Sequence, residues 1–288
     1  MTLIGGLRAI RRRDLAFIVA GGIAAGLLLA AIVAAAEPFP AFSLGPGQDS
    51  HSYWAAPLAD PYHVSVVGTQ DFYPYSPAIL QAMAPLKVLG WAAFSGLWAA
   101  LLLLVLLALT GPRLFVFGLL LALPELWGGN IHLPLALAVA AGLRRPGAWA
   151  FVLLTKVTPG VGLLWFALRR EWRALAVAVG TTAVIAGVSF VAQPAAWLDW
   201  GRILVENLGV AGGELSSGAA MGSIGVPFLV RLPAAIALIA WGARTDRPWL
   251  LPVAAMLAQP LVWFGGLTVL LGVVPYLRGA SWARPAQR

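Results

Sequence analysis

Apolar runs long enough to cross a lipid bilayer recur along the whole of this 288-residue sequence. A bilayer core takes about 20 residues of helix, and runs such as residues 101–109 lack the alternating polarity that a β-barrel strand needs. Backbone polar groups inside a bilayer must pair within their own segment, so the spans are predicted to be helices. Hydrophobic residues make up 60% of the chain and charged residues 10%, which excludes an ordinary soluble domain. We therefore predict an all-α polytopic membrane protein, with residues 1–288 forming a single integral membrane domain.

The basic residues lie in short clusters between the apolar runs, as they do in the cytoplasmic loops of membrane proteins. The net charge of +8 therefore reflects membrane topology and does not indicate nucleic-acid binding. Residues 1–14 and 279–288 are predicted to be cytoplasmic, in a multi-pass protein of the plasma membrane. The apolar run at 15–36 follows four arginines and, at 22 residues, is too long for a signal-peptide core. We interpret it as an uncleaved signal anchor.

The clusters and the apolar runs together predict about ten membrane helices, two pairs of which arise by a break in one apolar segment. Residues 149–168 are predicted to form two half-helices that meet near Lys156 and Pro159, because proline interrupts a helix. One straight helix there would also place three arginines on the outer side. Residues 249–277 are predicted to turn back near Gln259 in the same way. The other spans are predicted at residues 15–36, 91–109, 114–127, 131–143, 175–191 and 226–242.

Two long segments are predicted to lie outside the membrane, at residues 37–89 and 193–223. Loops longer than about 12–15 residues are usually functional, and the first one is rich in acidic and aromatic residues. Its residues 76–89 are predicted to form an amphipathic helix in the membrane interface. Asp49 in this loop is a candidate general base at the bilayer surface. The alternative interpretation is a solvated carboxylate or a helix N-cap beside Ser50.

Three of the cations outside the basic clusters are candidate ligands for a phosphate. Lys156 falls inside an apolar segment, where a lysine costs about 2.5–3.5 kcal/mol and needs a partner such as a lipid phosphate. The alternative is that its side chain extends to the interface. Arg202 and Arg231 fall on the predicted outer side, and arginine suits bidentate contact with phosphate. Each is equally consistent with an ordinary surface arginine.

Five further residues are candidates for substrate binding. Asn130 and His132 close a predicted outer hairpin, although a Gly-Asn pair is also ordinary turn chemistry. His51, Tyr53 and Tyr75 add polar and aromatic groups in the first outer loop. The chain has no cysteine and no recognisable metal-ligand spacing, so we predict no metal and no cofactor.

Several short motifs follow one another in a characteristic order. They are Asp-Ser-His-Ser-Tyr-Trp-Ala-Ala at 49–56, Phe-Tyr-Pro-Tyr-Ser-Pro at 72–77, Gly-Asn-Ile-His at 129–132, Lys-Val-Thr-Pro at 156–159 and Gln-Pro-Leu-Val-Trp at 259–263. In this order they resemble glycosyltransferase family 87, membrane enzymes of the GT-C fold that include mannosyltransferases. The sequence departs from the family pattern at residues 264–266, Phe-Gly-Gly, where the family often has a histidine.

The resemblance implies transfer of a hexose, usually mannose, from a polyprenyl-phosphate donor to a lipid or glycan acceptor on the extracytoplasmic face. Asp49 matches the aspartate that the family uses as its base, and Lys156 matches a lysine that contacts phosphate. A leaving phosphate needs cationic stabilisation, and an isoprenoid tail needs an apolar groove between short helices. Inversion at the anomeric carbon is then expected. The competing interpretations are a non-catalytic envelope-assembly protein and a transporter of small solutes or lipids, although no repeated halves are evident.

Overall fold

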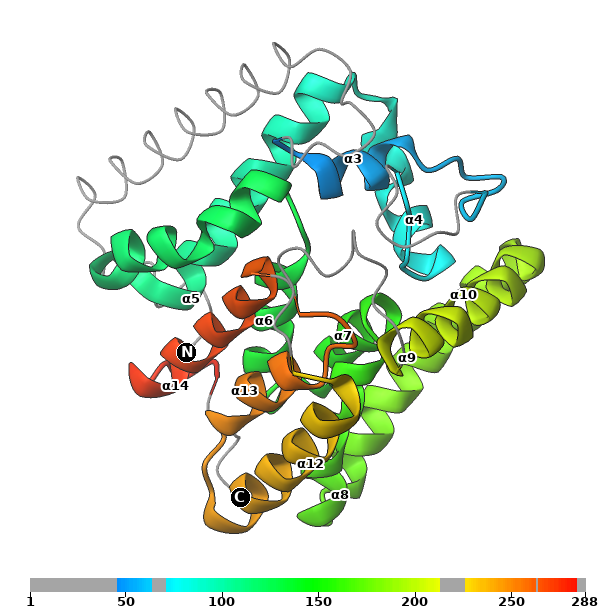
Figure 1. Cartoon of the computed structure of the whole chain (residues 1–288). Coiled ribbons are helices and arrows are strands. Elements are labelled where there is room, and N and C mark those ends of the chain that lie inside the picture. Colours follow the sequence, from blue (N-terminus) through cyan, green and yellow to red (C-terminus); the bar gives the residue numbers. More distant parts are fainter. Residues whose placement is uncertain (1–45, 64–70, 213–225, 263, 284–288) are drawn as a thin grey trace.

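The computed structural model describes residues 46–63, 71–212, 226–262 and 264–283, and these residues form helices without strands (Figure 1). The all-α prediction is therefore confirmed for the described part of the chain. The predicted first span at 15–36 lies outside it. Three of the described helices are long and apolar enough to cross a membrane, and the prediction of about ten spans remains untested. The three are α5 (Trp91–Gly128), α9 (Trp172–Ala192) and α12 (Phe228–Thr245).

Helix α5 is a helical hairpin rather than one straight rod. Its backbone leaves helical geometry at Gly111, with φ 66° and ψ 172°, and Pro112 follows. Positive φ is readily adopted only by glycine, so the chain turns here. The two arms meet again at their far ends, where the indole Nε1 of Trp98 donates to the carbonyl of Gly129 at 2.7 Å. The segments predicted at 91–109 and 114–127 are thus two arms of one helical hairpin, and their crossing of a membrane stays a prediction.

The predicted break near Lys156 is also confirmed. Lys156 has extended backbone geometry, with φ −131° and ψ 100°, directly after a short helix. The following segment doubles back, because a Cβ on Gly162 would lie 2.2 Å from the indole ring of Trp149. Pro159 lies at the start of this return segment, where its missing N–H costs nothing. The elements are α6 (His132–Gly142), η2 (Pro146–Ala148), α7 (Trp149–Thr155), η3 (Thr158–Leu163) and α8 (Leu164–Leu168).

A third hairpin turns near Gln259, as predicted. Its second arm packs on the first, because a Cβ on Gly272 would lie 3.0 Å from the ring of Pro252. That second arm begins with a long 3₁₀ segment, a geometry that rarely extends beyond a few residues. The elements are α13 (Leu250–Leu257), η4 (Phe264–Val273) and α14 (Val274–Leu277).

Two predictions for the outer segments need correction. The helix predicted at 76–89 ends early, because Pro85 cannot continue an α-helix, and a 3₁₀ turn follows it. The segment predicted as a loop at 193–223 begins with a helix that extends as far as the structure describes it. The elements here are α3 (Gln48–Ala55), α4 (Pro77–Met83), η1 (Ala84–Val88) and α10 (Pro194–Gly212).

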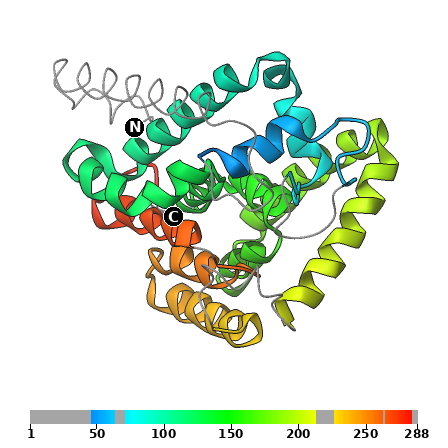
Figure 2. The same cartoon turned by 45° about the horizontal axis from the view of Figure 1, so that its top comes forward.

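The hairpins give the molecule two chemically different ends. At one end Arg278 lies against Gly111, and Arg144 Nη1 donates to the carbonyl of Ser281 at 2.7 Å. We call this the basic end. The turns after α5, α7 and α13 lie at the opposite end, beneath α3 (Figures 1 and 2). We call it the polar end, because the candidate site lies there.

Candidate active site

Helix α3 fixes Asp49 against the end of α5. The N–H of Gly47 donates to the carbonyl of Trp127 at 2.6 Å, and the hydroxyl of Ser50 donates back to the carbonyl of Gly47 at 2.9 Å. A Cβ on Gly128 would lie 2.8 Å from Oδ2 of Asp49, so the carboxylate occupies space that any larger residue would fill. Asp49 therefore belongs to a packed element and is not a freely solvated loop residue.

Asn130 lies in the turn between α5 and α6. Its Oδ1 accepts from the N–H of Ile131 at 2.7 Å and from the hydroxyl of Tyr75 at 3.3 Å. Its amide group donates toward Asp49. The hydroxyl of Tyr53 lies 3.3 Å from that of Tyr75 and extends the network into the first outer loop. The loop aromatics thus form one buried wall of the site.

A buried chain of three polar side chains forms the other wall. Nδ1 of His132 lies 2.8 Å from Oε2 of Glu125, and Nε2 of His132 lies 2.9 Å from Nζ of Lys156. Oε1 of Glu125 accepts from the N–H of Leu133 at 3.0 Å. The side chains of Glu125 and His132 are 0% and 1% exposed, whereas Lys156 is half-buried. Lys156 is therefore the least buried residue of the three.

These two walls define what we call the polar cluster: Asp49, Glu125, Asn130, His132 and Lys156. Asp49 is partly accessible, yet the protein around it raises the pKa of its carboxyl by desolvation. The Asn130 amide lowers that pKa, and the nearby carboxylate of Glu125 raises it further. Burial likewise raises the pKa of Tyr53 and Tyr75, so both phenols stay neutral. A carboxylate with a raised pKa is a stronger base than an ordinary aspartate.

Three predicted site residues have other partners. His51 lies with Nδ1 2.5 Å from Oδ1 of Asp71. Arg202 is exposed on α10 and pairs with Asp199 at 2.9 Å. The guanidinium of Arg231 donates to four backbone carbonyls, at 2.6 to 2.8 Å. The residues that the structure does bring together with Asp49 are Tyr53, Tyr75, Asn130, His132 and Lys156.

Glu125 was missed in the sequence. The signal that could have revealed it is a single carboxylate in the apolar run at 114–127, seven residues before His132. A charge inside such a run is expensive and usually marks a site. Among the described residues, no three His, Asp or Glu side chains converge in a way that would hold a metal ion.

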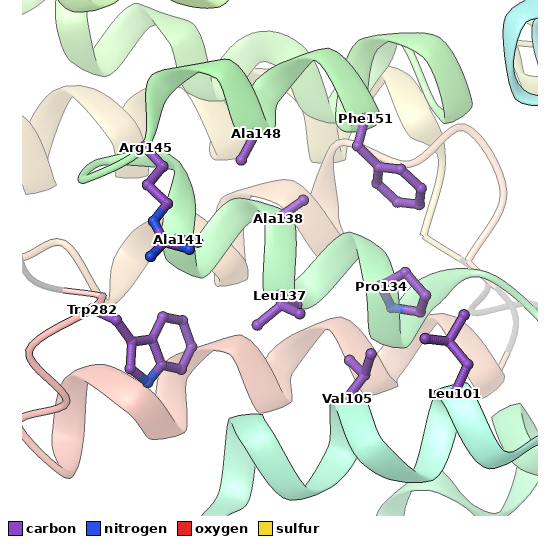
Figure 3. Close-up of a pocket in the computed structure, with 10 residues that line it drawn as sticks. All are labelled: Leu101, Val105, Pro134, Leu137, Ala138, Ala141, Arg145, Ala148, Phe151 and Trp282. Carbon is purple, nitrogen blue, oxygen red and sulfur yellow. The ribbon is translucent and has the colours of Figure 1, made fainter. Parts of the chain in front are cut away.

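An apolar groove of about 360 Å³ lies along one face of α6 and ends at Arg145 on the side of the basic end (Figure 3). Pro134, two residues after His132, lies at one end, and Arg145 and Trp282 lie at the other. One face of α6 forms its floor. The lining residues are Leu101, Val105, Pro134, Leu137, Ala138, Ala141, Arg145, Ala148, Phe151 and Trp282.

The family model of glycosyltransferase family 87 matches residues 72–281, which is well over half of the chain. The chain belongs to glycosyltransferase family 87. It is therefore an enzyme that transfers a sugar, and its apolar helices indicate a membrane protein. Neither a curated protein nor a solved structure matches the chain, so the GT-C fold stays a prediction. The family match includes Glu125, Asn130, His132 and Lys156 and begins after Asp49.

Membership of family 87 decides between the interpretations that the sequence left open. A sugar-transferring enzyme needs a donor and an acceptor, which neither the transporter nor the non-catalytic interpretation provides. The sugar, its carrier and the stereochemistry are not given by the family match.

Proposed function

We propose that this family 87 enzyme moves a hexose, in our view mannose, from a polyprenyl-phosphate donor to a lipid or glycan acceptor. The reaction is proposed to take place on the extracytoplasmic face of the plasma membrane, at the polar end of a multi-pass protein with both termini in the cytoplasm. The observation that carries the proposal is that one cluster brings together the carboxylate of Asp49 and the ammonium of Lys156, two residues that are each only partly buried.

Asp49 is proposed as the general base. It takes the proton from an acceptor hydroxyl while the hydroxyl oxygen attacks the anomeric carbon of the donor sugar. The bond from that carbon to the phosphate oxygen breaks, and the phosphate leaves with the electron pair. Attack from the side opposite the phosphate inverts the anomeric centre. A positioned base of this kind contributes roughly 10²–10⁴ in rate.

Lys156 is proposed to stabilise the phosphate as it leaves. A phosphate monoester is a good leaving group and needs a cation rather than a proton donor. The half-buried position of Lys156 supports this role, because a cation in a drier environment acts more strongly on a nearby anion than one in water. The neutral Tyr53, Tyr75 and the amide of Asn130 are proposed to hold hydroxyl groups of the sugar or acceptor.

The apolar groove supports a lipid-linked donor. It begins beside the N-terminal turn of α6, which carries His132, and continues along that helix away from the cluster. An isoprenoid chain in contact with such a surface gains roughly 0.8 kcal/mol per buried CH₂ group. We propose that part of the donor tail lies here while its phosphate faces Lys156.

The test is sugar transfer from a polyprenyl-phosphate mannose to endogenous acceptors in membranes that contain the Asp49→Asn protein. Transfer should fall by about 10²–10⁴, with unchanged donor binding. Asp60→Asn is the matched control, because Asp60 is exposed in the same outer segment. Turnover of Asp49→Asn equal to that of the unmodified enzyme would rule out the base assignment. Failure of every polyprenyl-phosphate sugar to react would rule out the donor class.

A further inference from the structure

Among the residues that the structure describes, Glu125 is the most deeply buried charged group that the proposed chemistry does not use. Its side chain is 0% exposed inside an apolar arm of α5. Removing a carboxylate from water costs several kcal/mol unless it is fully paired. Both of its oxygens are paired, one with the ring of His132 and one with the N–H of Leu133. Its charge therefore acts directly on the His132 ring.

The hydrogen bonds fix the protonation pattern of the neighbouring imidazole. A carboxylate accepts only, so Nδ1 of His132 carries the hydrogen that it donates to Glu125. An ammonium donates only, so Nε2 of the same ring presents its lone pair to Lys156. The three side chains therefore form one directed chain of donors, with a neutral imidazole between a positive and a negative group.

This series of hydrogen bonds sets the direction of the Lys156 ammonium. One N–H of Lys156 is held by His132, which leaves two N–H groups for a ligand. The tip of the third hairpin covers the other end of the chain, because a Cβ on Gly265 would lie 3.3 Å from Oε2 of Glu125. Water is thereby kept from the carboxylate, and the carboxylate cannot rotate away from the ring.

We propose that Glu125 is a positioning residue. Through the Nδ1–H tautomer of His132 it holds the Lys156 ammonium beside Asp49, oriented to receive an anionic oxygen of a phosphate ester. The identity of that ligand rests on the proposed function, whereas the orientation of the ammonium does not.

Magnetic resonance of selectively labelled protein in lipid nanodiscs tests the orientation directly. The chain has three histidines and two lysines, so ¹⁵N-histidine and ¹³Cε-lysine spectra are simple to assign. The unmodified protein should show His132 as the Nδ1–H tautomer. Glu125→Gln should mix the two tautomers and shift the Lys156 signal, while the Lys87 signal stays in place as an internal control. Unchanged His132 and Lys156 signals in Glu125→Gln would overturn the proposal.

Two changes at His132 separate positioning from general disruption. His132→Gln keeps one donor and one acceptor, so it should retain most of the Lys156 signal position. His132→Leu keeps neither, and should shift that signal as Glu125→Gln does. Equal shifts in both variants, with equal thermal stability, would show that only packing matters and would overturn the proposal. This pair also remains informative if Glu125→Gln folds poorly.

Binding of undecaprenyl phosphate then separates the inference from the proposed function. Glu125→Gln should weaken binding on the order of 10–100-fold, as expected for a buried group that orients a ligand side chain. His132→Gln should weaken it much less. If the spectra change as expected but binding does not, the positioning role is supported and the phosphate role of Lys156 in the proposed function is overturned.

Discussion

Two broken hairpins bring a cation to the polar end of the molecule, and they use it in opposite ways. The α7–η3 hairpin carries Lys156 in its own break, where the side chain contacts His132 and remains half-buried. The α13–η4 hairpin is met by Arg231 from α12, which donates to the carbonyls of Leu257, Gln259, Pro260 and Val226. Lys156 keeps N–H donors for a ligand, whereas Arg231 uses its donors to bind backbone carbonyls.

The difference follows from how each break satisfies its own carbonyl groups. A helix end leaves up to four carbonyls without a helical partner. At the first break the N–H of Lys156 donates to Val152, and the hydroxyl of Thr155 donates to Phe151. Nothing is then required of the lysine side chain. At the second break three carbonyls converge, and a guanidinium with five N–H donors can pair with these three and with the carbonyl of Val226 at once.

The largest expected effect on stability comes from Arg231→Met. Four backbone carbonyls would lose their donor in an apolar environment, and an unpaired buried polar group costs about 1–3 kcal/mol. We expect the unfolding free energy to fall by at least about 3–5 kcal/mol. Thermal unfolding in detergent measures this. Arg231→Lys should lie between the two, because lysine has only three donors. Stability of Arg231→Met equal to that of the unmodified protein would contradict the stabilising role of these four hydrogen bonds.

A loss of activity second only to that of Asp49→Asn is expected from Lys156→Met. Removing one preorganised group that stabilises developing charge costs about 10²–10³ in kcat. Stability should stay the same or rise, because the substitution removes a poorly solvated charge. Sugar transfer and thermal unfolding, measured on the same preparation, check both parts. If Lys156→Met lost as much stability as Arg231→Met and kept its activity, Lys156 would have a structural role and would not be the cation that binds the ligand.

The pH dependence of transfer should reveal Asp49. Its carboxyl has a raised pKa, first by desolvation, so activity should fall with decreasing pH at values above the ordinary aspartate pKa of about 3.9. The contribution of Asp49 to folding stability changes with pH in the opposite direction. A raised pKa in the folded state means that the folded protein binds a proton more tightly, so this contribution is present at low pH and is lost as pH rises through the folded pKa.

Asp49→Asn therefore should be more stable than the unmodified enzyme at neutral pH and equally stable in acid. Thermal unfolding from pH 3 to pH 8 measures the difference between the two proteins. A constant difference across this range would show that folding does not raise the pKa of the Asp49 carboxyl. A limb of the activity profile at the ordinary aspartate pKa would contradict its placement in a desolvated site.

The sequence predicted the hairpin breaks more successfully than the roles of the charges. Pro159 and Pro260 interrupt apolar runs, and proline acts locally through its fixed φ and missing N–H, so no knowledge of the fold was needed. The role of a cation is set by its acceptor, which lies elsewhere in the chain. Arg231 looked the same as Lys156 in sequence because its carbonyl partners lie 26 to 29 residues away in most cases.

Glu125 and α10 show two other limits of sequence reasoning. Glu125 stood in a run that fitted a span, and its pairing with His132 depends on a tight turn that returns the chain onto itself. The sequence predicts a loop in place of helix α10, because Asp199, Arg202 and Glu206 interrupt any apolar run long enough to span a membrane. A helix that need not cross a membrane leaves no such run to detect.

The smallest expected effect comes from Arg202→Ala, and it sharpens the comparison of cations. The Arg202 side chain is 64% exposed and pairs with Asp199 one helical turn away. Exposed pairs at this spacing contribute about 0.3–0.5 kcal/mol, so stability should change by no more than that. Transfer should stay within about twofold, because a screened surface charge has little effect on a distant anion. A loss of transfer as large as that of Lys156→Met would require α10 to close over the polar cluster during turnover. The proposed phosphate site would then need two cations rather than one.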